Sequence, residues 1–129
     1  MADTMLAVHQ AVFDALEAGV AAATVHTHAP EGTAFPYVEI SRHIADANDA
    51  LSTDYLDSLI YLTVWSEYQG TKQVLEILAE IHTALHNVKL TLTTGASLLC
   101  RVVDRTTSMD TDGKTHMGQA TVRVMSQNV

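Results

Sequence analysis

The chain has 129 residues, of which 47% are hydrophobic, and a formal net charge of −8 at pH 7. This length predicts one domain over residues 1–129 that is large enough to bury a core of its own. Because only seven residues are Lys or Arg, and binding to a nucleic-acid backbone needs a basic surface, the charge argues against a protein that binds nucleic acid directly.

The first predicted element is a helix over residues 4–18, with Asp3 or Thr4 as its cap and Gly19 as its end. Its apolar residues recur at helical spacing, at Met5, Val8, Val12 and Leu16. Acidic residues near the N-terminus do not fit a signal peptide, and no apolar run approaches the ~20 residues of a membrane span. We therefore expect the protein to stay in the compartment where it is made.

Residues 19–34 form a predicted loop with a brief extended piece at Val25. A strand follows over 35–41, which Pro36 restricts to a strand start or a sheet edge. We place the tip of a long hairpin at 48–53 and a second strand over 56–66. In its part from 59 to 65, apolar side chains alternate onto both faces, which is typical of a central strand covered on both sides.

A second helix is predicted over 71–88, with Gly70 or Thr71 at its cap. A third strand over 98–105 contains Cys100, the single cysteine, which we expect to be buried and which excludes an internal disulfide. Asp112-Gly113 predicts a turn, followed by a fourth strand over 118–126. The order α-β-β-α-β-β predicts an α+β fold, a mainly antiparallel four-stranded sheet with two helices packed on one face.

Two segments approximate metal-binding patterns. His82 and His86 lie four residues apart on the predicted helix, which brings two imidazoles to one side. No third ligand or zinc-protease glutamate accompanies them, so we expect them at a helix–sheet margin or a subunit contact. Residues 108–119 approximate a calcium loop, but Ser108 and Gln119 replace the acidic first and last ligands, so a hairpin turn is expected. We predict no metal and no cofactor.

Nucleophilic catalysis has no support in the local motifs. The chain lacks the nucleophile elbow, the phosphate-binding loop and the dinucleotide-binding glycine motif. We therefore predict no catalytic residues and no enzyme.

The segment from Leu59 to Asn87 reads LIYLTVWSEYQGTKQVLEILAEIHTALHN and changes from strand to helix chemistry across one turn. It resembles the centre of the phage tail completion family, also called tail terminators or head-to-tail joining proteins. The matching positions are Trp65, Ser66, Tyr68, Gly70, Leu85 and His86. Residues 35–38 resemble the family's first strand, and 112–116 resemble its last turn. The three blocks span about 5–125.

The resemblance implies a virion structural protein at the head–tail interface, assembled in the host cytoplasm. It implies a homo-oligomeric ring, a hexamer, that caps the finished tail tube and stops its polymerisation. Its partners would be the tail tube protein and the head connector or neck protein. DNA would pass through the lumen as cargo, and no membrane would be involved.

Contact residues are expected in the loops 44–55 and 106–115, because loops on a rigid sheet commonly carry recognition. Trp65 fits either a core residue or an interface anchor. The acidic run between Arg42 and Lys72 fits a solvated loop or, given the resemblance, a lining that repels DNA. Our interface candidates are Trp65, Tyr68, Asp46, Asp49, Asp54, Asp112 and His116.

A second hypothesis is a small cytoplasmic α+β enzyme or ligand-binding domain with a pocket near His82 and His86. Such a protein should have a concave pocket with converging polar groups. A ring subunit should instead show apolar patches on opposite sides.

Overall fold

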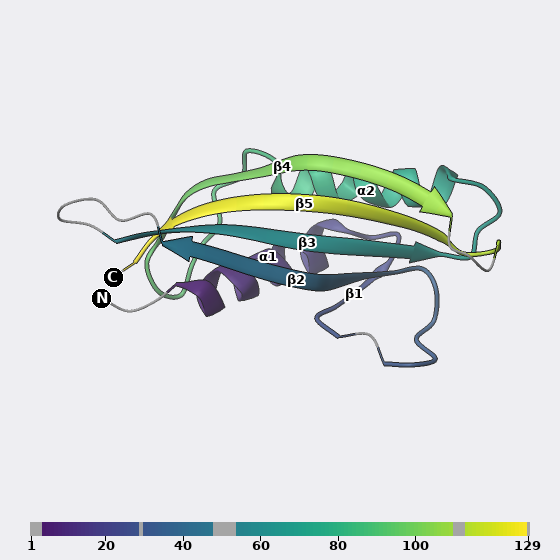
Figure 1. Ribbon diagram of the computed structural model, residues 1–129, viewed down its shortest axis with the longest axis horizontal. Coiled ribbons are helices and arrows are strands. Elements are labelled where there is room, and N and C mark those ends of the chain that lie inside the picture. The colour runs from purple at the N-terminus through teal and green to yellow at the C-terminus, as the bar shows by residue number, and fades with distance from the viewer. Residues whose placement is uncertain (1–3, 29, 48–53, 110–112, 129) are drawn as a thin grey trace.

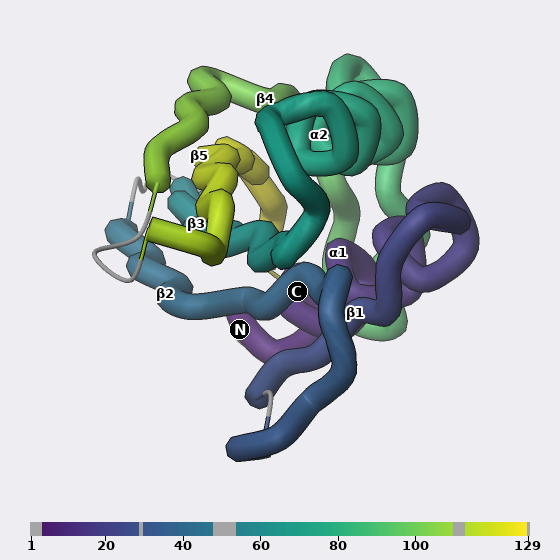
Figure 2. The backbone as a smooth tube through the Cα atoms, turned by 90° about the vertical axis from the view of Figure 1, so that its right-hand side faces the viewer, coloured from purple at the N-terminus to yellow at the C-terminus, as the bar shows by residue number. Residues whose placement is uncertain are grey.

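The computed structural model describes residues 4–28, 30–47, 54–109 and 113–128. In this part of the chain two helices lie on one face of a five-stranded sheet of order β1-β2-β3-β5-β4 (Figures 1 and 2). No helix described there is long and apolar enough to span a membrane. The elements in chain order are α1 (Met5–Gly19), β1 (Thr24–His26), β2 (Tyr37–Ala47), β3 (Tyr55–Ser66), α2 (Lys72–Leu85), β4 (Ala96–Met109) and β5 (His116–Gln127).

The predicted α+β class is confirmed, whereas the four-stranded sheet is wrong. The fifth strand is β1, at the place where an extended piece was expected around Val25. It pairs in parallel with the start of β2, from Thr24 opposite Tyr37 to His26 opposite Glu39. Three residues are too few for an alternating pattern, so this strand depends on its pairing with β2 rather than on its own sequence. All other pairs in the sheet are antiparallel.

Two strands continue farther than predicted. β2 runs to Ala47 and β4 to Met109, so the expected contact loops 44–55 and 106–115 both begin as strand. β2 contains a register shift at Ser41, and β4 contains two, at Leu98 and at Val103. An extra residue reverses the alternation of side chains, which hides the second half of the strand from a pattern search. The predicted hairpin tip at 48–53 lies outside the described residues.

The core lies between the sheet and the two helices. Its largest fully buried side chains come from both helices and the three central strands, for example Leu16, Ile60, Leu62, Ile77, Ile81 and Val122. Gly118 on β5 brings α2 close, because a Cβ atom there would lie 2.6 Å from Cγ1 of Val74. Cys100 is buried as expected, and burial raises the pKa of its thiol to about 11.

β3 is central in the sheet, yet the chain covers only one of its faces. The residues that alternate toward the helices, such as Ile60 and Val64, are fully buried, whereas Leu59, Tyr61 and Trp65 on the opposite face are half-buried. We call this second face, which the helices do not cover, the open face. The apolar pattern on both sides of β3 is therefore satisfied on one side only within a single chain.

Candidate assembly surfaces

The open face is rich in aromatic and apolar side chains. The strand register places Trp65 opposite Tyr37 on β2 and Met117 on β5. Farther along β3, Tyr61 lies opposite Arg42, whose guanidinium carbon is 5.9 Å from the centre of the phenol ring. Such a partly desolvated aromatic face is a typical place for protein contacts.

The aromatic side chains gather at the end of the open face where β3 finishes. This end of β3 lies on the right in Figure 1. The rings of Phe35 and Tyr37 are 5.4 Å apart between centroids, and Trp65 lies directly opposite Tyr37. Partial burial, and then the charge of Glu39, raise the pKa of the Tyr37 phenol. We call Phe35, Tyr37 and Trp65 the aromatic end.

The other end of the same face carries carboxylates. Asp46 at the end of β2 lies opposite Asp57 near the start of β3. Arg123 on β5 binds Asp57 with two nitrogens, Nε at 3.0 Å from Oδ1 and Nη2 at 2.8 Å from Oδ2. This bond and the charge of Asp57 raise the pKa of Arg123 against a smaller opposing effect of burial. Asp46 remains exposed. We call Asp46 and Asp57, together with Asp54 just before β3, the acidic end.

The predicted interface residues do not form one cluster. Asp46 on β2 lies opposite Asp57, which is eight residues away from Trp65 along β3. At the usual rise per residue this separation is about 27 Å. Tyr68 follows β3 and is 50% exposed, and its backbone N–H donates to the Ser66 hydroxyl at 3.1 Å. His116 begins β5 and is 9% exposed.

The remaining candidates lie near the start of β3 or cannot be placed. Asp54 immediately precedes β3, and its carbonyl accepts a hydrogen bond from the N–H of Asn128 at 2.9 Å. Asp49 and Asp112 lie outside the described residues. Trp65 has Tyr37 and Met117 as its cross-strand neighbours. Neither was among the predicted interface residues, because strand register cannot be read from the sequence of one strand.

His86 directly follows α2 and connects the end of this helix to β4, and His82 on α2 stacks against it. Their rings stack with centroids 4.4 Å apart. The backbone N–H of Val102 donates to Nδ1 of His86 at 3.2 Å, so the neutral ring carries its proton on Nε2 and has no lone pair there for a metal. Burial, then Arg105, then His86 lower the pKa of His82. Among the described residues no three metal-ligating side chains meet.

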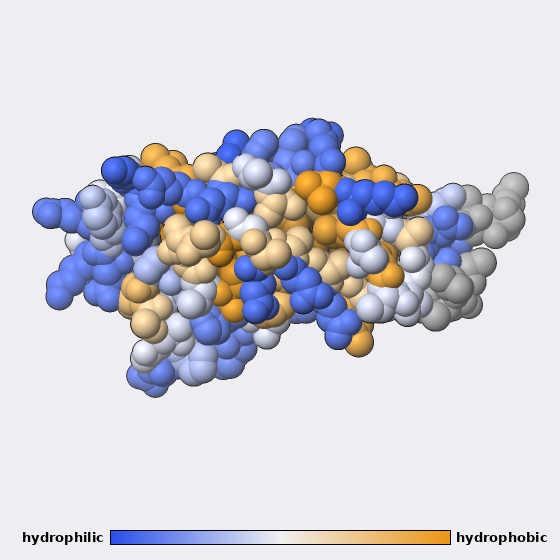
Figure 3. Space-filling view, turned by 180° about the vertical axis from the view of Figure 1, so that it is seen from behind, coloured by the Kyte–Doolittle hydropathy of each residue, from blue (hydrophilic) through white to orange (hydrophobic). Residues whose placement is uncertain are grey.

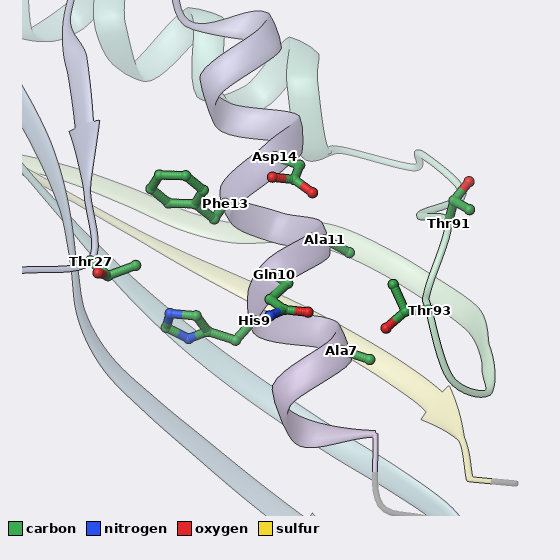
Figure 4. Close-up of a pocket in the computed structure, with 9 residues that line it drawn as sticks. All are labelled: Ala7, His9, Gln10, Ala11, Phe13, Asp14, Thr27, Thr91 and Thr93. Carbon is green, nitrogen blue, oxygen red and sulfur yellow. The ribbon is translucent and has the colours of Figure 1, made fainter.

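A groove of about 300 Å³ runs beside α1 and is lined by Ala7, His9, Gln10, Ala11, Phe13, Asp14, Thr27, Thr91 and Thr93. Figure 4 shows His9 and Phe13 on one side of the helix and Ala7 and Ala11 on the other. The polar groups that line the groove therefore point in different directions. In a catalytic or ligand-binding site they would converge on one point.

The helix side also exposes apolar surface. Leu6 on α1 is 68% exposed and Leu75 on α2 is 51% exposed. Figure 3 views the molecule from this side and shows apolar patches separated by polar side chains. The molecule thus presents apolar side chains on two opposite faces.

Comparison with known proteins gives two findings. The model of a family described as tail completion protein gp17 matches residues 6–127. A chain of the solved "Virion of native gene transfer agent (GTA) particle" has the same fold, with a TM-score of 0.85 at 15% identity, covering 99% of this chain and 100% of that one. No curated protein matches the sequence.

Proposed function

Because this chain belongs to the tail completion protein gp17 family, and is thus a structural protein of the virion tail, we propose that it forms a homo-oligomeric ring, a hexamer, that caps the tail tube. The ring stops polymerisation of the tube and joins it to the head connector or neck protein. DNA passes through the lumen without binding there. Residues 1–129 act as one domain, which the single core supports.

The observation that carries this proposal is the pair of uncovered surfaces on opposite sides of a chain that matches the family over residues 6–127. A closed ring needs a heterologous contact, in which one patch meets a different patch of the next subunit. Apart from that contact, exposed Leu6 and Leu75 on the helix side and half-buried Tyr61 and Trp65 on the open face leave apolar surfaces for contacts with other virion proteins. The groove beside α1 gives no comparable support to an enzyme or ligand-binding domain.

The two ends of the open face fit the two neighbours of such a ring. We assign the aromatic end to the tail tube, because aromatic residues dominate the energetics of protein contacts. Tyr68, which follows β3, belongs to the same contact. We assign the acidic end to the head connector, where the charge of Asp46 and Asp54 also disfavours adhesion of passing DNA. Asp49, Asp112 and His116 stay predicted contacts without an assignment.

A tube-growth assay tests the capping function. Purified tail tube protein is polymerised with and without the chain, and tube lengths are measured by negative-stain imaging. We expect shorter tubes with an extra layer at one end, in proportion to the amount of chain added. Tubes of unchanged length and without end density would contradict the capping function.

A further inference from the structure

The outer edge of β4 is covered by its own chain only as far as Val102. The N–H of Asn87 donates to the carbonyl of Cys100 at 2.8 Å, and the N–H of Val102 donates to His86 Nδ1. Residues 103–109 are all exposed. The extra residue at Val103 shifts the register, so the backbone groups of Arg105, Thr107 and Met109 point away from β5. Within the described residues these groups have no partner.

The opposite edge of the sheet has a matching uncovered segment. β1 pairs with β2 only from Tyr37 to Glu39. From Arg42 to Ala47, β2 pairs with β3 alone in the described part of the chain. By the same alternation of the ladder, Ala45 and Ala47 direct their backbone groups away from β3. An uncovered strand edge of this kind is a template for pairing with another strand.

The uncovered segments of β2 (42–47) and β4 (104–109) start at the same row of paired residues and run in opposite directions from it. Arg42, Tyr61, Thr121 and Asp104 lie side by side across β2, β3, β5 and β4. From this level β2 continues to Ala47 toward one end, and β4 continues to Met109 toward the other. Each uncovered segment therefore has six residues, and the two lie diagonally across the sheet.

We propose that copies of this chain join edge to edge, with residues 105–109 of β4 pairing antiparallel with residues 43–47 of β2 in the next copy. Arg105 then lies opposite Ala47 and Thr107 opposite Ala45, all with side chains on the helix side, where the alanines leave room for the larger partners. β2 and β4 run oppositely within one sheet, and rotation about a ring axis preserves that relation. This inference rests on the proposed ring and names its subunit contact.

The stagger of the two segments suits a closed ring. Arg105 is level with Leu62 of β3 and Ala47 with Leu56, six positions or about 20 Å apart along the strands. Four strands per copy span about 19 Å across the sheet. Together these give a strand tilt of about 45° to the ring axis, at the upper end of the range found in closed β-barrels.

Cysteine cross-linking tests the register. Asp46→Cys combined with Thr106→Cys places two thiols on the open face at a pair whose Cα atoms would be about 4.5 Å apart, within disulfide range. Cys100 is buried and of raised pKa, so it stays out of the reaction. Under mild oxidation we expect a ladder of covalent oligomers that ends at the mass of the ring.

The matched control is Arg42→Cys combined with Thr106→Cys, which moves one thiol by about 14 Å along the same face of β2. It should give no ladder, and neither should the single variants. Two results would overturn the edge contact alone. In the first, the wild type forms rings but the Asp46→Cys/Thr106→Cys variant gives no ladder. In the second, the control gives a ladder as strong as that of the test pair. If the wild-type chain forms no ring by itself or on tail tubes, the proposed function fails and this contact fails with it.

Thr107→Pro tests the same edge through the backbone. The N–H that it removes points away from β5, and proline is tolerated on edge strands, so the fold should persist by circular dichroism. Ring formation should require at least a tenfold higher concentration. Thr107→Val retains the N–H and should form rings as the wild type does. Rings of Thr107→Pro at the wild-type concentration would contradict the proposal.

Discussion

Arg123 and Gly118 show how single residues set the two faces of the sheet. On the open face Arg123 neutralises the charge of Asp57. Asp46, which lies opposite Asp57 on β2, keeps its exposed negative charge. On the helix side Gly118 removes the side chain that would keep α2 away from β5. Both residues lie on β5, one facing outward and one inward.

Gly118→Ala should lower the free energy of unfolding by about 1–3 kcal/mol, the usual cost of overpacking. The new Cβ would meet Val74 Cγ1 at 2.6 Å and Leu78 Cδ1 at 3.3 Å. Urea unfolding measures the loss. In a Val74→Ala background the added methyl has room. The double variant should therefore lose less unfolding free energy than the sum of the two single losses. Additive losses would show that the close approach is not the cause.

His82 predicts a pH dependence of stability. Its pKa is lowered in the folded chain by burial, Arg105 and His86, so the unfolded chain binds its proton first as the pH falls. The contribution to stability is therefore complete above the ordinary histidine pKa of about 6.5 and is lost as the pH falls toward the lowered value. We expect His82→Gln to reduce the difference in unfolding free energy between pH 7.5 and pH 5.5. An unchanged difference in the His82→Gln variant would contradict this role of His82.

At the scale of elements, the start of α1 is fastened to the end of β5. Thr4 occupies the cap position of α1, but its hydroxyl makes no helix cap. It donates to Oδ1 of Asn128 at 2.7 Å and lies 2.7 Å from the hydroxyl of Ser126. The backbone N–H of Thr4 donates to the same Asn128 oxygen at 3.2 Å. The first helix and the last strand are thus joined by a partly buried polar network.

Asn128→Ala should lower the free energy of unfolding by about 1–3 kcal/mol, because the buried Thr4 donors lose their acceptor. Thermal or urea unfolding measures it. Asn128→Asp retains an oxygen acceptor at this position and should cost less. Equal losses in the two variants would indicate that the network depends on something other than the acceptor.

The helices were predictable from the sequence because each has an apolar stripe that faces the core. α1 was predicted within one residue at each end, whereas α2 ends three residues earlier than expected. The reason for the early end is a long-range contact, since Asn87 adopts a φ of 55° and donates its N–H to Cys100 on β4. β1 and the second halves of β2 and β4 depend on pairing partners and register shifts, which the sequence does not display.

For the candidate site, the sequence indicated which side chains suit an interface but not where they meet. Trp65 was identified by its type, while Tyr37 and Met117 become its neighbours only through strand pairing. The apolar pattern on both sides of β3 predicted more coverage than one chain provides. That difference identifies the open face as a surface that assembly can cover.

At the scale of the whole molecule, the strand direction separates an aromatic end from an acidic end. Trp65→Ala removes a large side chain from the aromatic end and should weaken binding to tail tubes at least tenfold in a co-sedimentation assay, as a contact hot spot would. Asp46→Asn at the acidic end should leave tube binding unchanged. Unaltered binding of a correctly folded Trp65→Ala variant would contradict the assignment of the aromatic end to the tube.

Native mass spectrometry of the purified protein over a wide concentration range, alone and with tail tubes, shows whether identical copies of this chain form a ring. We expect a closed oligomer of six chains with an open lumen in negative-stain images, formed by the chain itself or on contact with the tubes. A compact dimer at every concentration that also ignores the tubes would contradict it.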